Sequence, residues 1–100
     1  RVRIKIMSYH KTPYKITITT AAAELVDPGT PAGINLKARI IRNLSTSVSV
    51  WLGASDVTAD SSKGFELKPG SDFPDSLSNG KMYAIVASGT ADVQVWEVIN

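Results

Sequence analysis

The sequence predicts an all-β protein, either an antiparallel β-sandwich or a jelly-roll-like barrel of seven to eight short strands with an extended N-terminal arm. Apolar and polar residues alternate with period two through residues 36–58 and 81–98, as they do in strands that bury one face. Turn-forming residues separate these stretches at intervals of about 8–12 residues. No segment carries a convincing helical pattern. A length of 100 residues and an apolar content of 43% suit one globular domain.

The first fifteen residues are predicted to form a basic extended arm or edge strand, ahead of a single β-sandwich domain over residues 16–100. They contain no acidic residue, and Pro13 interrupts their strand pattern. Apolar and basic residues alternate at the start, where the chain runs Arg1, Val2, Arg3, Ile4, Lys5 and Ile6. Such an arm suits an acidic partner surface. Alternatively, its basic side chains guard a solvated edge strand against pairing.

Charge is distributed unevenly along the chain. Residues 1–42 hold eight basic and two acidic residues, a net +6, whereas residues 43–100 hold three basic and seven acidic residues, a net −4. The acidic body would repel a phosphate backbone. The arm offers only Tyr9 and Tyr14 for stacking on bases. We therefore expect no nucleic-acid partner.

The first half of the domain is expected to contain three or four strand segments. Residues 16–26 read as one strand or two, with a short helix over 20–25 as the alternative. Residues 27–33 hold two Pro and two Gly and predict a loop. Residues 36–42 alternate Leu, Ala and Ile with Lys, Arg and Ile, and a turn follows over 43–47, where Asn43 suits an Asx or left-handed conformation. The next strand, 48–52, places Val48, Val50 and Leu52 inward and Trp51 outward.

The second half begins with a long polar loop over residues 53–64 and a short strand over 65–67. Lys68-Pro69-Gly70-Ser71 has the composition of a type II turn. Residues 72–77 are expected to form a short strand that bends at Pro74, followed by a hairpin turn over 78–80.

Both faces of the next strand, residues 82–87, are apolar, which predicts a central position in a sheet. A turn over residues 88–90 leads into the last strand. There Val93 and Val95 point inward and Trp96 points outward. Trp96 and Trp51 are each expected either to lie in an interface between subunits or to cover a layer of the sandwich.

Residues that could support catalysis or bind a cofactor are scarce. Cysteine is absent and His10 is the only histidine, so neither a Cys nucleophile nor a His-rich metal site is available. Asp56 and Asp60 read as solvated turn residues rather than as calcium ligands. No glycine-rich phosphate motif, no membrane-spanning apolar run and no signal-peptide core occurs. We expect no enzyme activity, no cofactor, no metal and no membrane contact.

Five motifs follow one another in a recognisable order. They are RNLS at 42–45, VSVWLG at 48–53, DVT at 56–58, GFELKPG at 64–70 and the hairpin MYAI–SGTADV at 82–93. In this order they resemble small all-β proteins from tailed-bacteriophage structural gene clusters, over residues 36–97. The resemblance implies a virion accessory part: a capsid decoration (cement) protein, or a domain of a tail or fibre protein. The pattern carries no catalytic residues.

The resulting expectation is a homotrimeric decoration protein, made in the host cytoplasm, that binds the major capsid protein on the outside of the phage head. The alternative is a carbohydrate- or receptor-binding module of a tail fibre or baseplate, with Trp51, Tyr83 or Trp96 stacking on sugars. The residues expected to contact a partner are Arg1, Val2, Arg3, Ile4, Lys5, Ile6, Tyr9, Lys11, Trp51 and Trp96.

Overall fold

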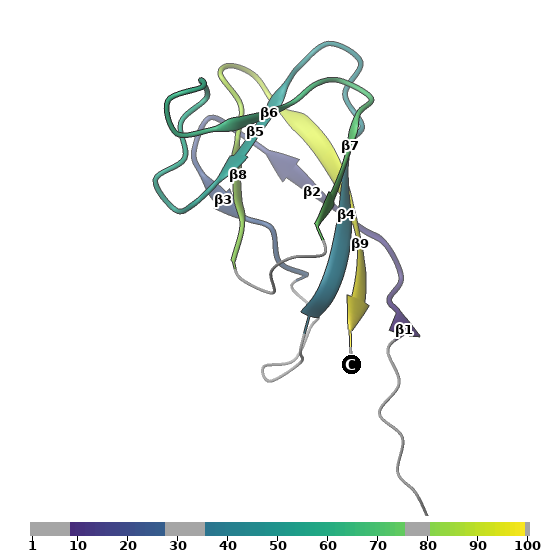
Figure 1. Cartoon of the computed structure of the whole chain (residues 1–100). Helices are drawn as coiled ribbons and strands as arrows, with labels where there is room; N and C mark the ends of the chain where they lie inside the picture. Colours follow the sequence, from purple (N-terminus) through teal and green to yellow (C-terminus); the bar gives the residue numbers. More distant parts are fainter. Residues whose placement is uncertain (1–8, 28–35, 76–80, 100) are drawn as a thin grey trace, which may run out of the picture.

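The computed structural model describes residues 9–27, 36–75 and 81–99, which form two antiparallel sheets and no helix (Figure 1). The prediction of an all-β fold is confirmed. Sheet A has the order β1/β2–β9–β4–β7, with β1 (Tyr9–His10), β2 (Tyr14–Ile18), β9 (Ala91–Ile99), β4 (Leu36–Asn43) and β7 (Asp72–Asp75). Sheet B has the order β3–β8–β5–β6, with β3 (Ala23–Glu24), β8 (Tyr83–Ile85), β5 (Val50–Gly53) and β6 (Phe65–Leu67).

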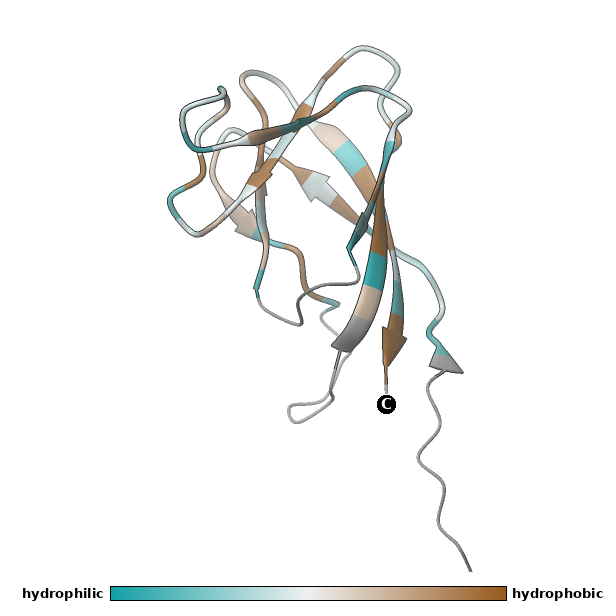
Figure 2. Cartoon of the chain, viewed as in Figure 1, coloured by the Kyte–Doolittle hydropathy of each residue, from teal (hydrophilic) through white to brown (hydrophobic). Residues whose placement is uncertain are grey.

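The hydrophobic core lies between the inner faces of the two sheets. Period-two burial continues along all of β9, and apolar and polar bands alternate along β4 and β9 in Figure 2. The core side chains are at most 4% exposed, and burying them removes apolar surface from water; they are Ile18, Leu25, Ile41, Val50, Leu52, Leu67, Ala84, Val86, Ala91, Val93 and Val95. The inward positions predicted for Val50, Leu52, Val93 and Val95 are confirmed.

The sheets do not overlap along their whole length. β4 and β9 continue downward in Figure 1 beyond the strands of sheet B. We call residues 41–43 of β4 and 91–95 of β9, with the parts of β2 and β7 beside them, the upper half of sheet A. Residues 36–40 of β4 and 96–99 of β9, with β1 and the end of β7, are the lower half. The upper half supplies the apolar core side chains of sheet A, which include Ile41 and Val95.

The connection from β6 to β7 takes the chain from sheet B to sheet A through the predicted turn. The Ser71 N–H donates to the Lys68 carbonyl at 3.0 Å, and Gly70 has φ +76°. This is the geometry of a type II turn, in which the third residue must accept a positive φ. The prediction for residues 68–71 is confirmed.

Asn43 joins the two sheets from a fully buried position at the end of β4. Its Nδ2 donates to the carbonyls of Val48 (2.8 Å) and Leu67 (2.9 Å), and its Oδ1 accepts from the Ser45 N–H at 2.9 Å. The last of these contacts is the predicted Asx turn. The left-handed alternative is wrong, because no residue other than glycine has positive φ in the described part of the chain.

β1 and β2 form one edge of sheet A, and both pair with β9. His10 lies opposite Val98 and Tyr14 lies opposite Val95, so residues 11–13 face only two residues of β9. One extra residue on an edge strand is a β-bulge, and it lies where Pro13 removes a backbone donor. The predicted boundary between the arm and the domain, between residues 15 and 16, falls inside β2.

Several expectations need correction. Nine strands occur within the described ranges, rather than seven or eight. The bulge divides the edge strand into β1 and β2, and Ala23–Glu24 forms a separate short strand, β3. The helix alternative for residues 20–25 is wrong, since Ala23–Glu24 pairs with β8. β8 is central, as predicted, but ends at Ile85 rather than at residue 87. The predicted arm over residues 1–8, most of the predicted loop 27–33 and the predicted turn 78–80 lie outside the described residues.

Candidate functional site

The outer face of sheet A is polar in its upper half. Arg42 on β4 donates two hydrogen bonds to the carboxylate of Asp72 on β7, at 2.7 and 3.0 Å. Thr17 on β2 donates to Asp92 on β9 at 2.6 Å. Gln94 follows on the same face, opposite Arg42. This half of the face is therefore a conventional solvated surface.

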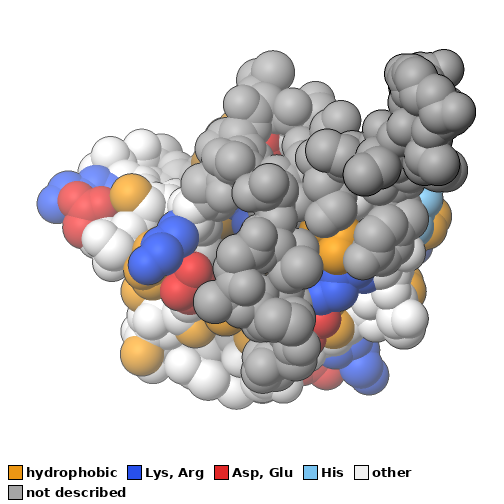
Figure 3. Space-filling model, turned by 90° about the horizontal axis from the view of Figure 1, so that it is seen from below, with side chains coloured by type: hydrophobic (Ala, Val, Ile, Leu, Met, Phe, Trp, Pro, Cys, Tyr) orange, Lys and Arg blue, Asp and Glu red, His pale blue; other side chains and the backbone are white. Residues whose placement is uncertain are grey.

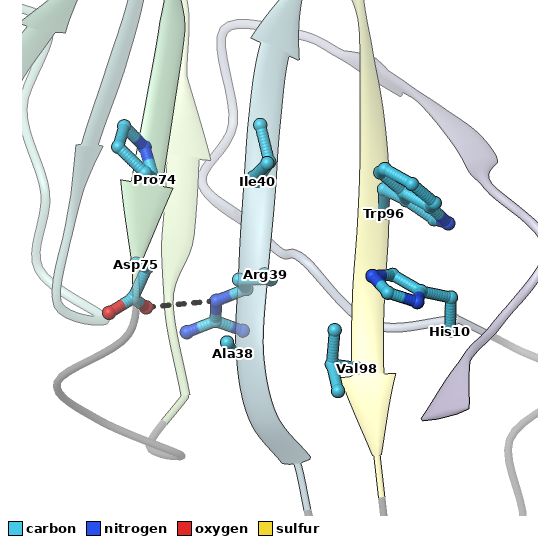
Figure 4. A pocket seen from close by; sticks show the side chains of 8 residues that line it. All are labelled: His10, Ala38, Arg39, Ile40, Pro74, Asp75, Trp96 and Val98. Atoms are coloured by element: carbon cyan, nitrogen blue, oxygen red, sulfur yellow. Dashed lines mark hydrogen bonds and ion pairs between the residues drawn. The ribbon is translucent and has the colours of Figure 1, made fainter. Parts of the chain in front are cut away.

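The lower half of the same face is apolar. The strand register places its side chains in two cross-strand rows. One row consists of Pro74, Ile40 and Trp96, and the other of Ala38, Val98 and His10 (Figure 4). We call these six residues the apolar patch. Ile40 is 39% and Trp96 41% exposed. Although these side chains are the ones expected in a core, they lie on the outside of the sheet.

Trp96 is held in one orientation by two contacts. Its ring lies beside the His10 ring, with centroids 4.5 Å apart and an interplanar angle of 30°. Its Nε1–H donates to the Lys11 carbonyl at 2.8 Å, within the β-bulge. An aromatic side chain that is already fixed loses little conformational entropy when a partner covers it. Trp96 is thus prepared to act as a binding anchor.

The patch is hollowed into a shallow groove. Its volume is about 240 Å³, and Arg39 and Asp75 also line it. Figure 4 shows His10 and Trp96 along one side and Pro74 on the other, with Ile40 between them. Small-molecule pockets usually measure roughly 300–1,000 Å³, so this groove suits one or two side chains of a partner better than an enclosed ligand.

The inner face of the lower half carries buried charges. Arg39 on β4 lies opposite both Asp75 on β7 and Glu97 on β9, and its Nε donates to Asp75 Oδ2 at 3.1 Å. The three side chains are 4%, 8% and 7% exposed. Figure 3 views the molecule from this end, where basic and acidic side chains also lie beside one another on the surface. Sheet A therefore changes polarity along the strands: in the lower half three charged side chains lie inside beside the buried Ile99, and apolar groups lie outside.

The buried charges also hold the residues that follow β1. Lys11 Nζ lies 2.6 Å from Asp27 Oδ2 and 3.6 Å from Glu97 Oε1, and the Tyr14 hydroxyl donates to Glu97 at 2.9 Å. Burial, reinforced by the negative charge of Glu97, raises the pKa of Tyr14. Burial by itself would lower the pKa of Lys11, but Asp27 and Glu97 outweigh it and raise that pKa. Lys11, expected to contact a partner, is engaged within its own chain.

The two tryptophans lie on opposite sides of the protein. Trp51 is on the outer face of sheet B, half-buried, opposite Ile85 and Glu66 on its neighbouring strands. Tyr9 lies in β1 opposite Ile99, and Arg1, Val2, Arg3, Ile4, Lys5 and Ile6 lie outside the described residues. Trp51 and Trp96 therefore cannot form one binding surface within a single chain.

Five of the six patch residues were not among those expected to contact a partner: His10, Ala38, Ile40, Pro74 and Val98. Period-two patterns show which side chains share a strand face, but only the pairing of β7, β4 and β9 brings these residues together. The one available signal was the apolar character of the Ala38 and Ile40 face, which the structure turns outward.

The carboxylates of the loop after β5 are bound by other residues of the same loop. Asp60 accepts from Thr58 and from the hydroxyl and N–H of Ser62, and these hydrogen bonds, that of the Ser62 hydroxyl above all, lower its pKa. Asp56 lies 3.7 Å from Lys63 Nζ.

Within residues 9–27, 36–75 and 81–99, no three His, Asp or Glu side chains are grouped so as to hold a metal ion. The same residues include no helix with the length and apolarity for crossing a membrane.

The chain was compared with models of protein families, with curated proteins and with solved structures, and none of them matches it.

Proposed function

We propose that this chain is a non-enzymatic structural protein of a virion, a phage capsid decoration (cement) protein that binds the major capsid protein on the outer surface of the head and stabilises the shell. The proposal places it on the capsid surface after synthesis in the host cytoplasm. The observation that carries it is the apolar patch around Trp96, because contiguous exposed apolar surface marks sites of protein contact.

The change of polarity supports an interaction role for the lower half of sheet A. Burying Arg39, Asp75 and Glu97 removes charges from water, which costs free energy even when the charges are paired. Leaving Ile40 and Trp96 on the outside forgoes the stabilisation that burying them would provide. A chain that needed only to fold would gain from the opposite arrangement. A partner that covers the patch recovers the lost apolar burial.

A decoration protein contacts both the shell and its neighbouring copies. The opposite placement of Trp96 and Trp51 supplies two different faces with a large aromatic side chain. Closed rings such as the proposed homotrimer require two different surfaces on each subunit. We also propose that the strands of the sandwich are connected as in a jelly roll.

The alternative is a carbohydrate- or receptor-binding module of a tail fibre or baseplate. It draws support from the exposed His10–Trp96 ring pair, since sugars stack on aromatic faces. The separation of Trp96 from Trp51 and Tyr83, which belong to sheet B, weighs against a shared aromatic platform. A glycan array probed with the whole protein distinguishes this alternative: saturable binding of one glycan class that Trp96→Ala abolishes would favour it over decoration.

The decoration proposal is tested on shells assembled from the major capsid protein encoded nearest to this chain. Wild-type protein should bind them saturably and raise their melting temperature. Trp96→Ala should weaken binding by roughly 30-fold or more, as for a hot-spot residue. Gln94→Ala, on the same strand and face but in the polar half, is the matched control and should bind within about threefold of wild type. Wild-type protein that fails to bind the shells would refute the proposal.

A further inference from the structure

We propose that the apolar patch of one copy receives the N-terminal segment Arg1–Ile6 of a second copy, bound in an extended conformation. The inference rests on the proposed function, since it names what holds the copies of the decoration protein together. It assigns the groove at Trp96 to the neighbouring copy, so that Trp96→Ala weakens shell binding by separating the copies that bind the shell together.

The size of the patch excludes a flat globular partner as its sole occupant. Four strand positions at about 4.8 Å and two rows about 6.8 Å apart cover an area on the order of 200–300 Å². A stable interface needs roughly 800 Å² from each partner. An extended segment suits a patch of this size, because it contacts the patch through only a few alternate side chains.

The geometry of the groove fits alternating apolar residues. Rows on one strand face repeat about every 6.8 Å, which is also the distance between alternate side chains of an extended chain. The rows of Ile40 and Ala38 therefore match two successive apolar positions of a segment that lies along β4. Val2, Ile4 and Ile6 provide such positions, and the residues between them are basic.

Charge favours the same pairing. Residues 1–8 carry three basic and no acidic residues, whereas residues 9–100 carry nine acidic and eight basic residues. β7, the outermost strand beside the groove, begins with Asp72 on the outer face, whereas Asp75 at its other end is buried and paired with Arg39. Asp72 is 42% exposed, so its carboxylate is accessible to a basic side chain that approaches over the rim, even though Arg42 also contacts it.

A second copy fits better than the same copy. Tyr9 and His10 are fixed in β1 on the far side of β9 from Ile40. To reach its own groove, the chain would have to reverse at Met7 and Ser8 and then cross the His10–Trp96 rings. Eight extended residues reach about 27 Å, which is sufficient to enter a neighbouring molecule.

The edges of sheet A are poor alternative binding sites for the segment. The β-bulge at residues 11–13 and Pro13 interrupt the edge formed by β1 and β2, and Pro74 deprives β7 of one backbone donor. Bulges and prolines of this kind protect sheet edges from pairing with another chain. Within the described parts of sheet A, the outer face of the lower half is then the apolar surface open to an incoming strand.

The experiment measures molar mass by light scattering in the absence of shells, using the full chain. Wild type should be oligomeric. A segment variant with Val2→Ser, Ile4→Ser and Ile6→Ser, and a groove variant with Trp96→Ala, should each associate at least tenfold more weakly. Ile40→Ser is a second groove variant that leaves the His10–Trp96 stack intact, and Gln94→Ala is the control that stays oligomeric. Urea denaturation verifies that each variant is folded.

Mixing the two kinds of variant is the decisive step. The groove variant supplies an intact segment and the segment variant supplies an intact groove, so their mixture should form heterodimers and nothing larger. A monomeric wild type, an oligomeric segment variant or a mixture that stays monomeric would overturn the inference. Shell binding is measured separately: oligomers that behave as expected but do not bind shells would refute only the decoration function, and shell binding by a wild-type monomer would refute only the exchange of segments.

Discussion

The upper and lower halves of sheet A use the same strands in opposite ways. In the upper half, Ile41 and Val95 face the core while Arg42 and Gln94 face solvent. In the lower half the inner positions hold Arg39, Asp75 and Glu97 beside the buried Ile99, and the outer positions hold the apolar patch. Strand alternation is identical in both halves, so it does not determine which face is apolar. The difference is that sheet B covers one half and, among the described residues, leaves the other to a charged cluster.

This comparison suggests a division of labour. The upper half is responsible for folding, because its apolar side chains lie within the core cluster. The lower half holds its inner face together by ion pairs and hydrogen bonds, and its apolar side chains remain available on the outside. Mutations should therefore separate stability from association along the length of two strands.

The largest effect is expected from breaking the inner cluster of the lower half. Arg39→Ala leaves Asp75 and Glu97 buried without the cation between them, which should cost about 3–5 kcal/mol of unfolding free energy. Urea denaturation measures it. Replacing Arg39 and Asp75 together with apolar residues of similar volume should restore most of the loss, because Glu97 still pairs with Tyr14 and Lys11. A small loss for Arg39→Ala would mean that water reaches the cluster.

Adjacent residues of β4 provide the sharpest test of the comparison. Ile41 is fully buried, so Ile41→Ala should reduce stability by about 2–5 kcal/mol. Ile40 is 39% exposed, and Ile40→Ala should cost about 1 kcal/mol or less while it weakens association. Parallel urea titrations and molar-mass measurements distinguish the two outcomes. Equal losses of stability would show that the patch belongs to the fold.

The hydrogen bond from Tyr14 to Glu97 should contribute about 1.5–3 kcal/mol near neutral pH, which Tyr14→Phe removes. The pKa values of Tyr14 and Lys11 are raised from 10.0 and 10.5 in the folded protein. Above those values the unfolded chain releases protons that the native protein retains, so stability should fall as the pH rises beyond about 10. Tyr14→Phe should lose less stability than wild type between pH 7 and about pH 11. A wild-type stability that is constant over this range would contradict the assignment.

The smallest effect is expected on the polar outer surface. Arg42 and Asp72 are 53% and 42% exposed, so Arg42→Ala should change the urea midpoint very little. The hydrogen bond from Arg42 lowers the pKa of Asp72, and the variant should return this pKa toward its ordinary value, as NMR titration of the carboxyl group would show. Because the pKa is lowered in the folded state, whatever stabilisation the pair provides is present above pH 3.8 and lost as the pH falls. A large destabilisation at pH 7 would contradict the view that this half is a solvated face.

The sequence by itself determined the local structure. Period-two alternation predicted strands, Pro69 and Gly70 predicted a type II turn, and Asn43 predicted either an Asx turn, which occurs, or a left-handed conformation, which does not. Each of these features depends on backbone preferences within a few residues. The inward positions of Val50, Leu52, Val93 and Val95 also followed from alternation, because on these strands one face is plainly more apolar.

Only the tertiary structure decided which face of β4 points outward and which residues form the patch. Arg39 and Ile40 are neighbours in the chain, yet Arg39 is buried because Asp75, 36 residues away, and Glu97 lie beside it in the sheet. A buried charge depends on its partners, and strand pairing brings those partners from distant parts of the chain. Pairing likewise assembles Pro74, Ile40 and Trp96 from three strands into one surface that no local pattern contains.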